Sequence, residues 1–211
     1  MSALSAKPAL VIHPRDVVVT IGQELPASTL FFVDIGAVTA WVVRHLTRSL
    51  PATFFTDTVW GAMDYAIPAA IGGKLAQPDA PVCAIVGDGG ALMGSVLDLF
   101  SAVEQHVPIL VIVFNDAGWG MVEHGVSESP LKDAKRPSFR FAQRVDFALL
   151  GRALGAHGVT IDDVPALRRA LADFLAEPRP TVLDVSIDPE ARPPIGGRTA
   201  HVNRHMDGDD R

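Results

Sequence analysis

The chain has 211 residues, of which 48% are hydrophobic, and a formal net charge of −6 at pH 7. This length suits one domain with a buried core, and the negative charge argues against nucleic acid as a partner. The single cysteine, Cys83, excludes an internal disulfide framework and fits a reducing cytoplasm. No apolar run approaches the length of a membrane span and residues 1–13 lack the apolar core of a signal peptide, so we expect no membrane association.

Helical and strand patterns alternate in the first half of the chain. After an expected arm over residues 1–13, apolar residues such as Val38, Trp41 and Val42 recur at helical spacing. The expected elements are a helix over 14–27, a strand over 30–33, a helix over 37–50, a short strand over 53–56 and a helix over 63–75.

Three strongly apolar runs in the rest of the chain are typical of strands buried on both faces. They cover residues 82–86, 110–114 and 181–187. The other expected elements are a crossover helix over 95–105, helices over 146–154 and 164–176, and a short strand over 157–160. This alternation predicts an α/β fold, a doubly wound parallel sheet with helices on both faces. We expect the domain to cover residues 14–190 and a tail rich in proline, glycine and charge to cover 191–211.

Two acidic motifs follow two of these strands. Gly87-Asp88-Gly89-Gly90 follows the 82–86 run, and Asn115-Asp116 follows the 110–114 run. A βαβ crossover brings both strand ends to one edge of a parallel sheet, where ligands of open α/β sheets bind. Carboxylates suit Mg²⁺, and the glycines let the main chain approach a phosphate at the start of a helix expected near Ala91. The pair therefore predicts a metal–diphosphate site.

Each motif alone also has a purely structural interpretation. Gly-Asp-Gly is compatible with an ordinary strand-to-helix turn, and Asn-Asp with a helix cap. The G-x-G-x-x-G fingerprint of dinucleotide sites is absent, and no Gly-Lys-Ser/Thr follows to make a P-loop. It is the spacing of the two motifs after two strands that favours the ligand site.

The paired motifs resemble the signature of thiamine diphosphate enzymes. More narrowly, they resemble the diphosphate-binding domain of the acetolactate synthase, benzoylformate decarboxylase and pyruvate decarboxylase group, over about residues 14–198. Asp34-Ile35-Gly36 resembles the family's Asp-x-Gly segment after the first strand. Residues 60–72 are similar to its Gly-x-Met-Gly…Leu-Pro-Ala-Ala-Ile-Gly run, and Gly118-Trp119-Gly120-Met121-Val122 is similar to its Gly-Tyr-Gly-Met-Val.

The resemblance implies thiamine diphosphate and Mg²⁺ as cofactors and a small 2-oxo acid as substrate. It places Mg²⁺ between Asp88, Asp116 and the Gly118 carbonyl, and Gly89 and Gly90 against the diphosphate. It implies that Met63 is an apolar wedge under the bent cofactor, that the Gly61 carbonyl accepts from the aminopyrimidine, that Met121 lies near the thiazolium and that His124 is an acid–base group. The implied catalytic residues are Met63, Met121 and His124. The other implied cofactor-binding residues are Gly36, Gly87, Trp119 and Gly120.

Three positions depart from the family's pattern. Asp116 stands where the family has its second asparagine, which adds negative charge beside a diphosphate. Asn115 is the alternative metal ligand; we favour Asp116, because Gly118-Trp119-Gly120-Met121 then falls into place. Asp64 and Ala66 replace glycines where the chain is expected to pass close to the cofactor. These changes keep a second hypothesis open, a non-catalytic binding or scaffold module with the same fold.

The family's activating glutamate has no counterpart here. The family supplies it from the pyrimidine-binding domain of a facing subunit, so we expect a diphosphate-binding subunit of a split decarboxylase or carboligase, in a hetero-oligomer and active only with that partner. A fragment of a full-length synthase is the alternative; the chain's own Met1 and the absence of an evident tag favour a natural subunit. Residues 127–140 are either a lid over the site or a plain surface loop.

Overall fold

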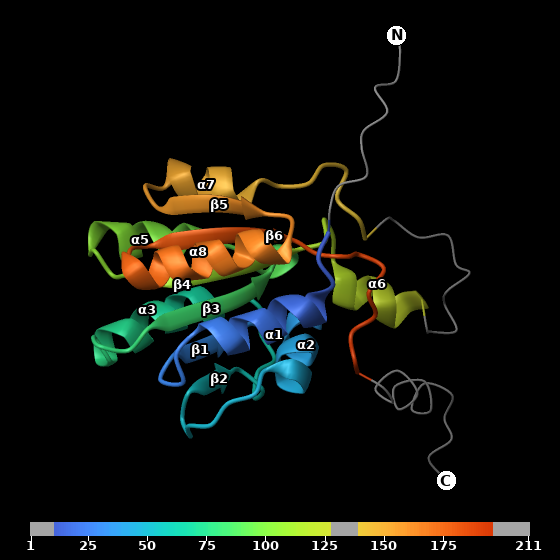
Figure 1. Cartoon of the computed structure of the whole chain (residues 1–211). Helices are drawn as coiled ribbons and strands as arrows, with labels where there is room; N and C mark the ends of the chain where they lie inside the picture. Colours follow the sequence, from blue (N-terminus) through green and yellow to red (C-terminus); the bar gives the residue numbers. More distant parts are fainter. Residues whose placement is uncertain (1–10, 128–138, 196–211) are drawn as a thin grey trace.

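The structure, a computed structural model, describes residues 11–127 and 139–195. Residues 1–10 of the expected arm, 128–138 of the proposed lid and 196–211 of the expected tail lie outside the described residues. Six strands form one sheet in which every pair of neighbours is parallel, in the order β2-β1-β3-β4-β6-β5 (Figure 1). The strands are β1 (Leu30–Val33), β2 (Phe54–Thr56), β3 (Val82–Gly87), β4 (Leu110–Asn115), β5 (His157–Ile161) and β6 (Thr181–Ser186). The expected doubly wound parallel sheet is confirmed.

Helices cover both faces of this sheet. One face packs against α1 (Pro14–Glu24), α2 (Ala37–His45) and α8 (Val164–Ala176). The other packs against α3 (Ala66–Ala76), α4 (Asp88–Leu92), α5 (Leu99–Glu104) and α7 (Phe147–Ala153). Alternate residues of each strand enter the two cores, because successive side chains of a strand point to opposite faces. In β3, Cys83 and Ile85 enter the first core, and Val82, Ala84 and Val86 enter the second.

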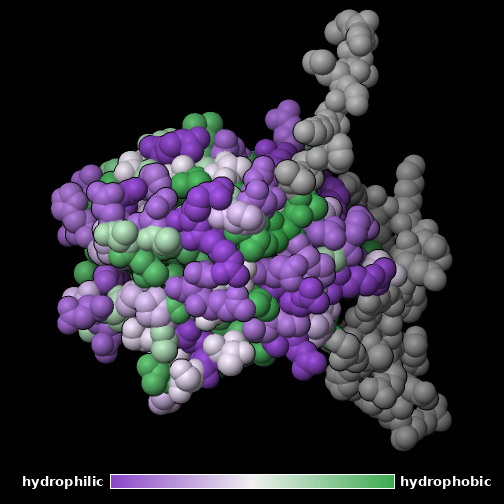
Figure 2. Space-filling view, in the orientation of Figure 1, coloured by the Kyte–Doolittle hydropathy of each residue, from purple (hydrophilic) through white to green (hydrophobic). Residues whose placement is uncertain are grey.

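The outer surface is polar where the helices face solvent. On the side that carries α1 and α8, hydrophilic residues predominate and hydrophobic ones form separate small patches (Figure 2). Within residues 11–127 and 139–195, no helix is long and apolar enough to cross a membrane.

The bounds of several expected helices differ in the structure; the helix expected over 14–27, for example, ends at Glu24. The expected crossover helix is divided into a 3₁₀ turn, η1 (Ser95–Asp98), and α5, and Gly94, with a φ of 142°, separates η1 from α4. The helix expected over 37–50 ends at His45, where Leu46 is extended and packs against the first core. The helix expected from Met63 begins at Ala66, because Asp64 has a φ of 74°, outside helical geometry.

The chain's path through the sheet creates a crevice. From β1 the chain continues to β2 on one side, whereas from β3 it continues to β4 on the other. The helices that follow β1 and β3 therefore diverge, and the gap between the carboxyl ends of these strands is the place where open α/β sheets bind ligands. Helix α6 (Gly120–Ser127) lies beyond this edge of the sheet (Figure 1).

Candidate functional site

A cleft lies at this switch point, formed by the loops that follow β1, β3, β4 and β6 and by Met63 before α3. Of the residues expected from the sequence, those that line it are Gly36, Met63, Gly87, Asp88, Gly89, Gly90, Asp116, Gly118, Trp119, Gly120 and Met121. The wall also contains apolar residues that the motifs did not single out for the site: Ile35, Ala37, Val38, Trp41, Phe114, Val122 and Ile187.

Two expected site residues do not line the cleft. Gly61, with a φ of 66°, is exposed in the loop before Met63. His124 lies about one helical turn beyond Met121 on α6, further from the strand ends, so the structure does not bring its ring to the cleft wall. Both were expected in the site because the family resemblance implied a role for them there.

Asp88 is held at the floor of the cleft by backbone amides. Its side chain sits directly after β3 and is only 3% exposed. The Gly89 amide donates to Oδ1 at 2.8 Å, and the Gly118 amide donates to Oδ2 at 3.0 Å. The second bond connects the loop after β3 to the loop after β4, so the two acidic motifs form one unit.

The structure separates Asn115 from Asp116. Asn115 Nδ2 donates to Asp184 Oδ1 at 2.8 Å and to the Val145 carbonyl at 2.9 Å, and its Oδ1 accepts from the Ala117 amide. The Asn115 side chain is therefore committed to the network that joins β4, β6 and α7. Asp116 lines the cleft instead, with a side chain that is 13% exposed.

The two carboxyl groups share a poorly solvated environment. Burial and, after it, the neighbouring charge of Asp116 together raise the pKa of Asp88 to about 7. Burial also raises the pKa of Asp116, although Arg140 opposes that shift. A cation beside two such buried carboxyl groups would stabilise their ionised forms.

The donor set fits Mg²⁺ rather than a softer metal. Among the residues that the structure describes, no group of three or more His, Cys, Asp or Glu side chains could hold a metal ion. Two carboxylates with a backbone oxygen would leave positions for water and phosphate oxygens, which is how Mg²⁺ is commonly bound.

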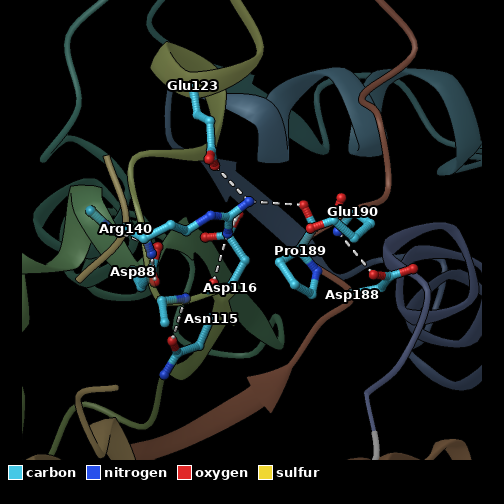
Figure 3. Close-up of polar contacts among 11 residues, drawn as sticks. Asp88, Asn115, Asp116, Glu123, Arg140, Asp188, Pro189 and Glu190 are labelled. Carbon is cyan, nitrogen blue, oxygen red and sulfur yellow. Dashed lines mark hydrogen bonds and ion pairs between the residues drawn. The ribbon is translucent and has the colours of Figure 1, made fainter. Parts of the chain in front are cut away.

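Arg140 is the residue of this region that sequence reasoning missed. The Trp119 amide donates to the Phe139 carbonyl and the Phe141 amide to the Ala117 carbonyl, both at 2.8 Å, so residues 139–141 run antiparallel to the loop after β4. This pairing carries the Arg140 guanidinium to Asp116, Glu123 and Pro189 (Figure 3). No periodic pattern in residues 127–140 signals this position, because it depends on a pairing between distant segments.

The glycines of the first motif make room for side chains. A Cβ on Gly89 would lie 2.7 Å from the Trp119 ring, and one on Gly90 would lie 2.5 Å from Asp34 Oδ2. A side chain at either position would therefore collide with Trp119 or Asp34. The helix expected near Ala91 is the short α4, which begins at Asp88.

Asp34 and Asp64 shape the segment before α3. Asp34, fully buried after β1, accepts from the amides of Asp64 at 3.0 Å, Tyr65 at 2.8 Å and Ala66 at 2.9 Å. Asp64 adopts the left-handed conformation, and its Oδ1 accepts from the Ser95 amide. The aspartate that replaces a family glycine thus binds the start of η1, and Met63 directly precedes this aspartate in the chain.

The comparisons with known proteins agree with this geometry. Residues 34–185 match the family described as thiamine pyrophosphate enzyme, C-terminal TPP binding domain. The chain is 31% identical over 176 residues to the acetolactate synthase large subunit of Parasynechococcus marenigrum, covering 83% of this chain and 28% of that protein. It is 28% identical over 192 residues to the sulfoacetaldehyde acetyltransferase of Alcaligenes xylosoxydans xylosoxydans, covering 87% of this chain and 30% of that protein.

A solved structure shares the fold. The thiamine diphosphate-dependent 4-hydroxybenzoylformate decarboxylase of Rhodococcus jostii RHA1 superposes with a TM-score of 0.77 at 21% identity, over 89% of this chain and 34% of that one. The chain spans about a third of the length of the curated relatives it matches.

Proposed function

We propose a function for this chain on the premise that it belongs to the family of thiamine pyrophosphate enzymes. Within that family it corresponds to the C-terminal cofactor-binding domain. The cofactor is thiamine diphosphate, and Mg²⁺ is typical of the family. The proposal is that the chain supplies the diphosphate-binding part of an active site that decarboxylates a small 2-oxo acid or joins its acyl fragment to an acceptor, as a lyase or a transferase.

The observation that supports this proposal is the meeting of Asp88 and Asp116 in one cleft, beside glycine backbone. We assign Mg²⁺ to these two carboxylates and the Gly118 carbonyl, and the diphosphate to the loop over Gly87–Gly90. The apolar wall, which includes Met63, Trp119 and Met121, keeps water from the reacting end. When bound, thiamine diphosphate supplies the electron sink that stabilises the carbanion left by loss of carbon dioxide.

A second polypeptide completes the site in this proposal. Glu123 lies on α6 beside the cleft, but its carboxylate is 2.6 Å from the Arg140 guanidinium and is 34% exposed. It is therefore engaged in an ion pair and is poorly placed to serve as the activating glutamate. We propose that a pyrimidine-binding domain on a separate chain supplies that glutamate, in a hetero-oligomer.

Calorimetric titration and a turnover assay test the two parts of this proposal separately. The chain is titrated with thiamine diphosphate in the presence of Mg²⁺, with the Asp88→Asn variant as a control for the metal site. Binding by the wild-type chain but not by the variant is expected; no binding by the wild-type chain, with or without a pyrimidine-domain polypeptide, would contradict the cofactor assignment. Pyruvate turnover is then measured with and without that polypeptide, and full turnover by the isolated chain would refute the split site.

A non-catalytic binding module is the second candidate, favoured by the carboxylate at position 116. In that case thiamine diphosphate binds weakly or not at all, and no 2-oxo acid is consumed with any pyrimidine-domain partner. The other departure, Asp64, does not favour it, because this residue has a structural role at the start of η1.

A further inference from the structure

The Arg140 guanidinium contacts both the backbone and the side chain of Asp116. Its Nη1 donates to the Asp116 carbonyl at 3.0 Å and lies 3.6 Å from Asp116 Oδ2. Its Nη2 donates to the Pro189 carbonyl at 3.1 Å and pairs with Glu123 Oε2 at 2.6 Å (Figure 3). The guanidinium therefore connects the loop after β4, helix α6 and the segment after β6, with a side chain only 28% exposed.

The charge of Arg140 matters because of what surrounds it. Asp88 and Asp116 carry two negative charges that would neutralise a divalent ion, and Glu123 adds a third beside them. A diphosphate approaching such a metal would meet a net negative site without Arg140. Since charge interactions are strong where water is largely excluded, one guanidinium at this distance changes whether an anion can bind.

We propose that Arg140 is a positioning residue of the metal–diphosphate site, which holds Asp116 toward the cleft and offsets its negative charge so that a diphosphate can bind beside the metal. This inference rests on the proposed function. It implies that the aspartate at position 116 and the arginine at position 140 form one functional unit, assembled by the antiparallel contact between residues 117–119 and 139–141.

Charge compensation has a signature that a merely structural role lacks. Arg140→Gln removes one positive charge, so a metal cation alone binds more tightly while a diphosphate binds less tightly. Loss of structure weakens both. Adding Asp116→Asn removes one negative charge, so the double variant has the same net charge as the wild-type site and regains diphosphate binding. A structural defect from the lost Arg140 contacts would persist in the double variant.

The test uses the full chain and two probes. Binding of Mn²⁺ alone is measured by electron paramagnetic resonance of the free ion. Binding of inorganic pyrophosphate is measured by calorimetric titration at saturating Mg²⁺. For Arg140→Gln we expect Mn²⁺ to bind severalfold more tightly and pyrophosphate on the order of tenfold more weakly. In Arg140→Gln/Asp116→Asn, pyrophosphate affinity should return to within about threefold of the wild-type value. Arg152→Gln, which removes an exposed arginine bonded to the Gly158 carbonyl, is the matched control and should change neither probe.

Circular dichroism establishes that each variant is folded. If Arg140→Gln does not fold, the Asp116→Asn single variant tests charge compensation, because it keeps the backbone contacts of Arg140. In this variant Mn²⁺ should bind more weakly and pyrophosphate more tightly than in the wild-type chain. Folded variants in which both probes weaken together, without rescue in the double variant, would overturn charge compensation and leave the cofactor site standing. A wild-type chain that binds neither probe would instead overturn the proposed site and this inference with it.

Discussion

The carboxylate of Asp34 is expected to be among the most costly side chains to remove. It satisfies three amides at the start of α3, of which that of Ala66 is fully buried and those of Asp64 and Tyr65 are partly buried. A buried donor left without a partner costs about 1–3 kcal/mol. With one fully buried and two partly solvated amides, Asp34→Ala should lower the free energy of unfolding by about 3–5 kcal/mol, a large part of the roughly 5–15 kcal/mol of a typical domain.

Urea denaturation followed by circular dichroism measures this loss as a lower midpoint at an unchanged slope. Asp34→Asn is the matched control, because its carbonyl oxygen can still accept from Tyr65 and Ala66; we expect a loss of about 1–2 kcal/mol. If Asp34→Ala were within about 1 kcal/mol of the wild type, the three hydrogen bonds would not stabilise the start of α3 as argued.

The same carboxyl group predicts a pH dependence. Burial raises the pKa of Asp34 above its ordinary 3.8, although the three amides and their hydrogen bonds oppose the shift. The folded state therefore binds this proton more readily than the unfolded state does. The Asp34 contribution to stability is fully present below pH 3.8 and is lost as the pH rises through the folded-state pKa. The wild-type chain should lose stability relative to Asp34→Asn over that interval, and a constant difference would contradict the sign.

Three other predictions concern the core and the site. Gly72 and Gly73 are neighbours in α3, but a Cβ on Gly72 meets open space whereas one on Gly73 would collide with the Phe32 ring. Gly72→Ala should therefore raise the free energy of unfolding by about 0.5–1 kcal/mol, and Gly73→Ala should lower it. Equal effects of the two substitutions in thermal melts would contradict this packing. Because the pKa of Asp88 is about 7, protons compete with the metal and Mn²⁺ affinity should fall about tenfold from pH 8 to pH 6; a flat profile by electron paramagnetic resonance would argue against Asp88 as a ligand. Cys83 is completely buried and its thiol pKa is raised by burial, so a thiol reagent should modify it only at the rate of unfolding, and rapid modification of the native chain would show that β3 is accessible.

Local patterns were sufficient to predict most of the architecture. The apolar runs of β3, β4 and β6 are buried on both faces, so they stand out in the sequence without any knowledge of their partners. Helix boundaries were predicted less well. Asp64 delays the start of the expected helix to Ala66 through an unusual backbone angle, and the crossover helix divides into η1 and α5. Neither effect is visible in hydrophobic periodicity.

Part of the candidate site could likewise be predicted from the sequence, and part could not. The motifs at Asp88 and Asp116 predicted a common edge, because a βαβ crossover has one favoured hand and brings successive strand ends together. The choice between Asn115 and Asp116 could not be derived from the residues alone, since it depends on Asp184, which lies on β6 and holds Asn115 away from the cleft.

The amino-acid sequence by itself determined the family, the parallel sheet and the two aspartates, because each depends on residues close together in the chain or on a short repeating pattern. Only the tertiary structure decided that Asp34 supports the start of α3, that Trp119 lies over Gly89 and that Arg140 faces Asp116. Those contacts join segments tens of residues apart, and their geometry depends on how the loops pack at the end of the sheet, which periodicity and composition do not encode.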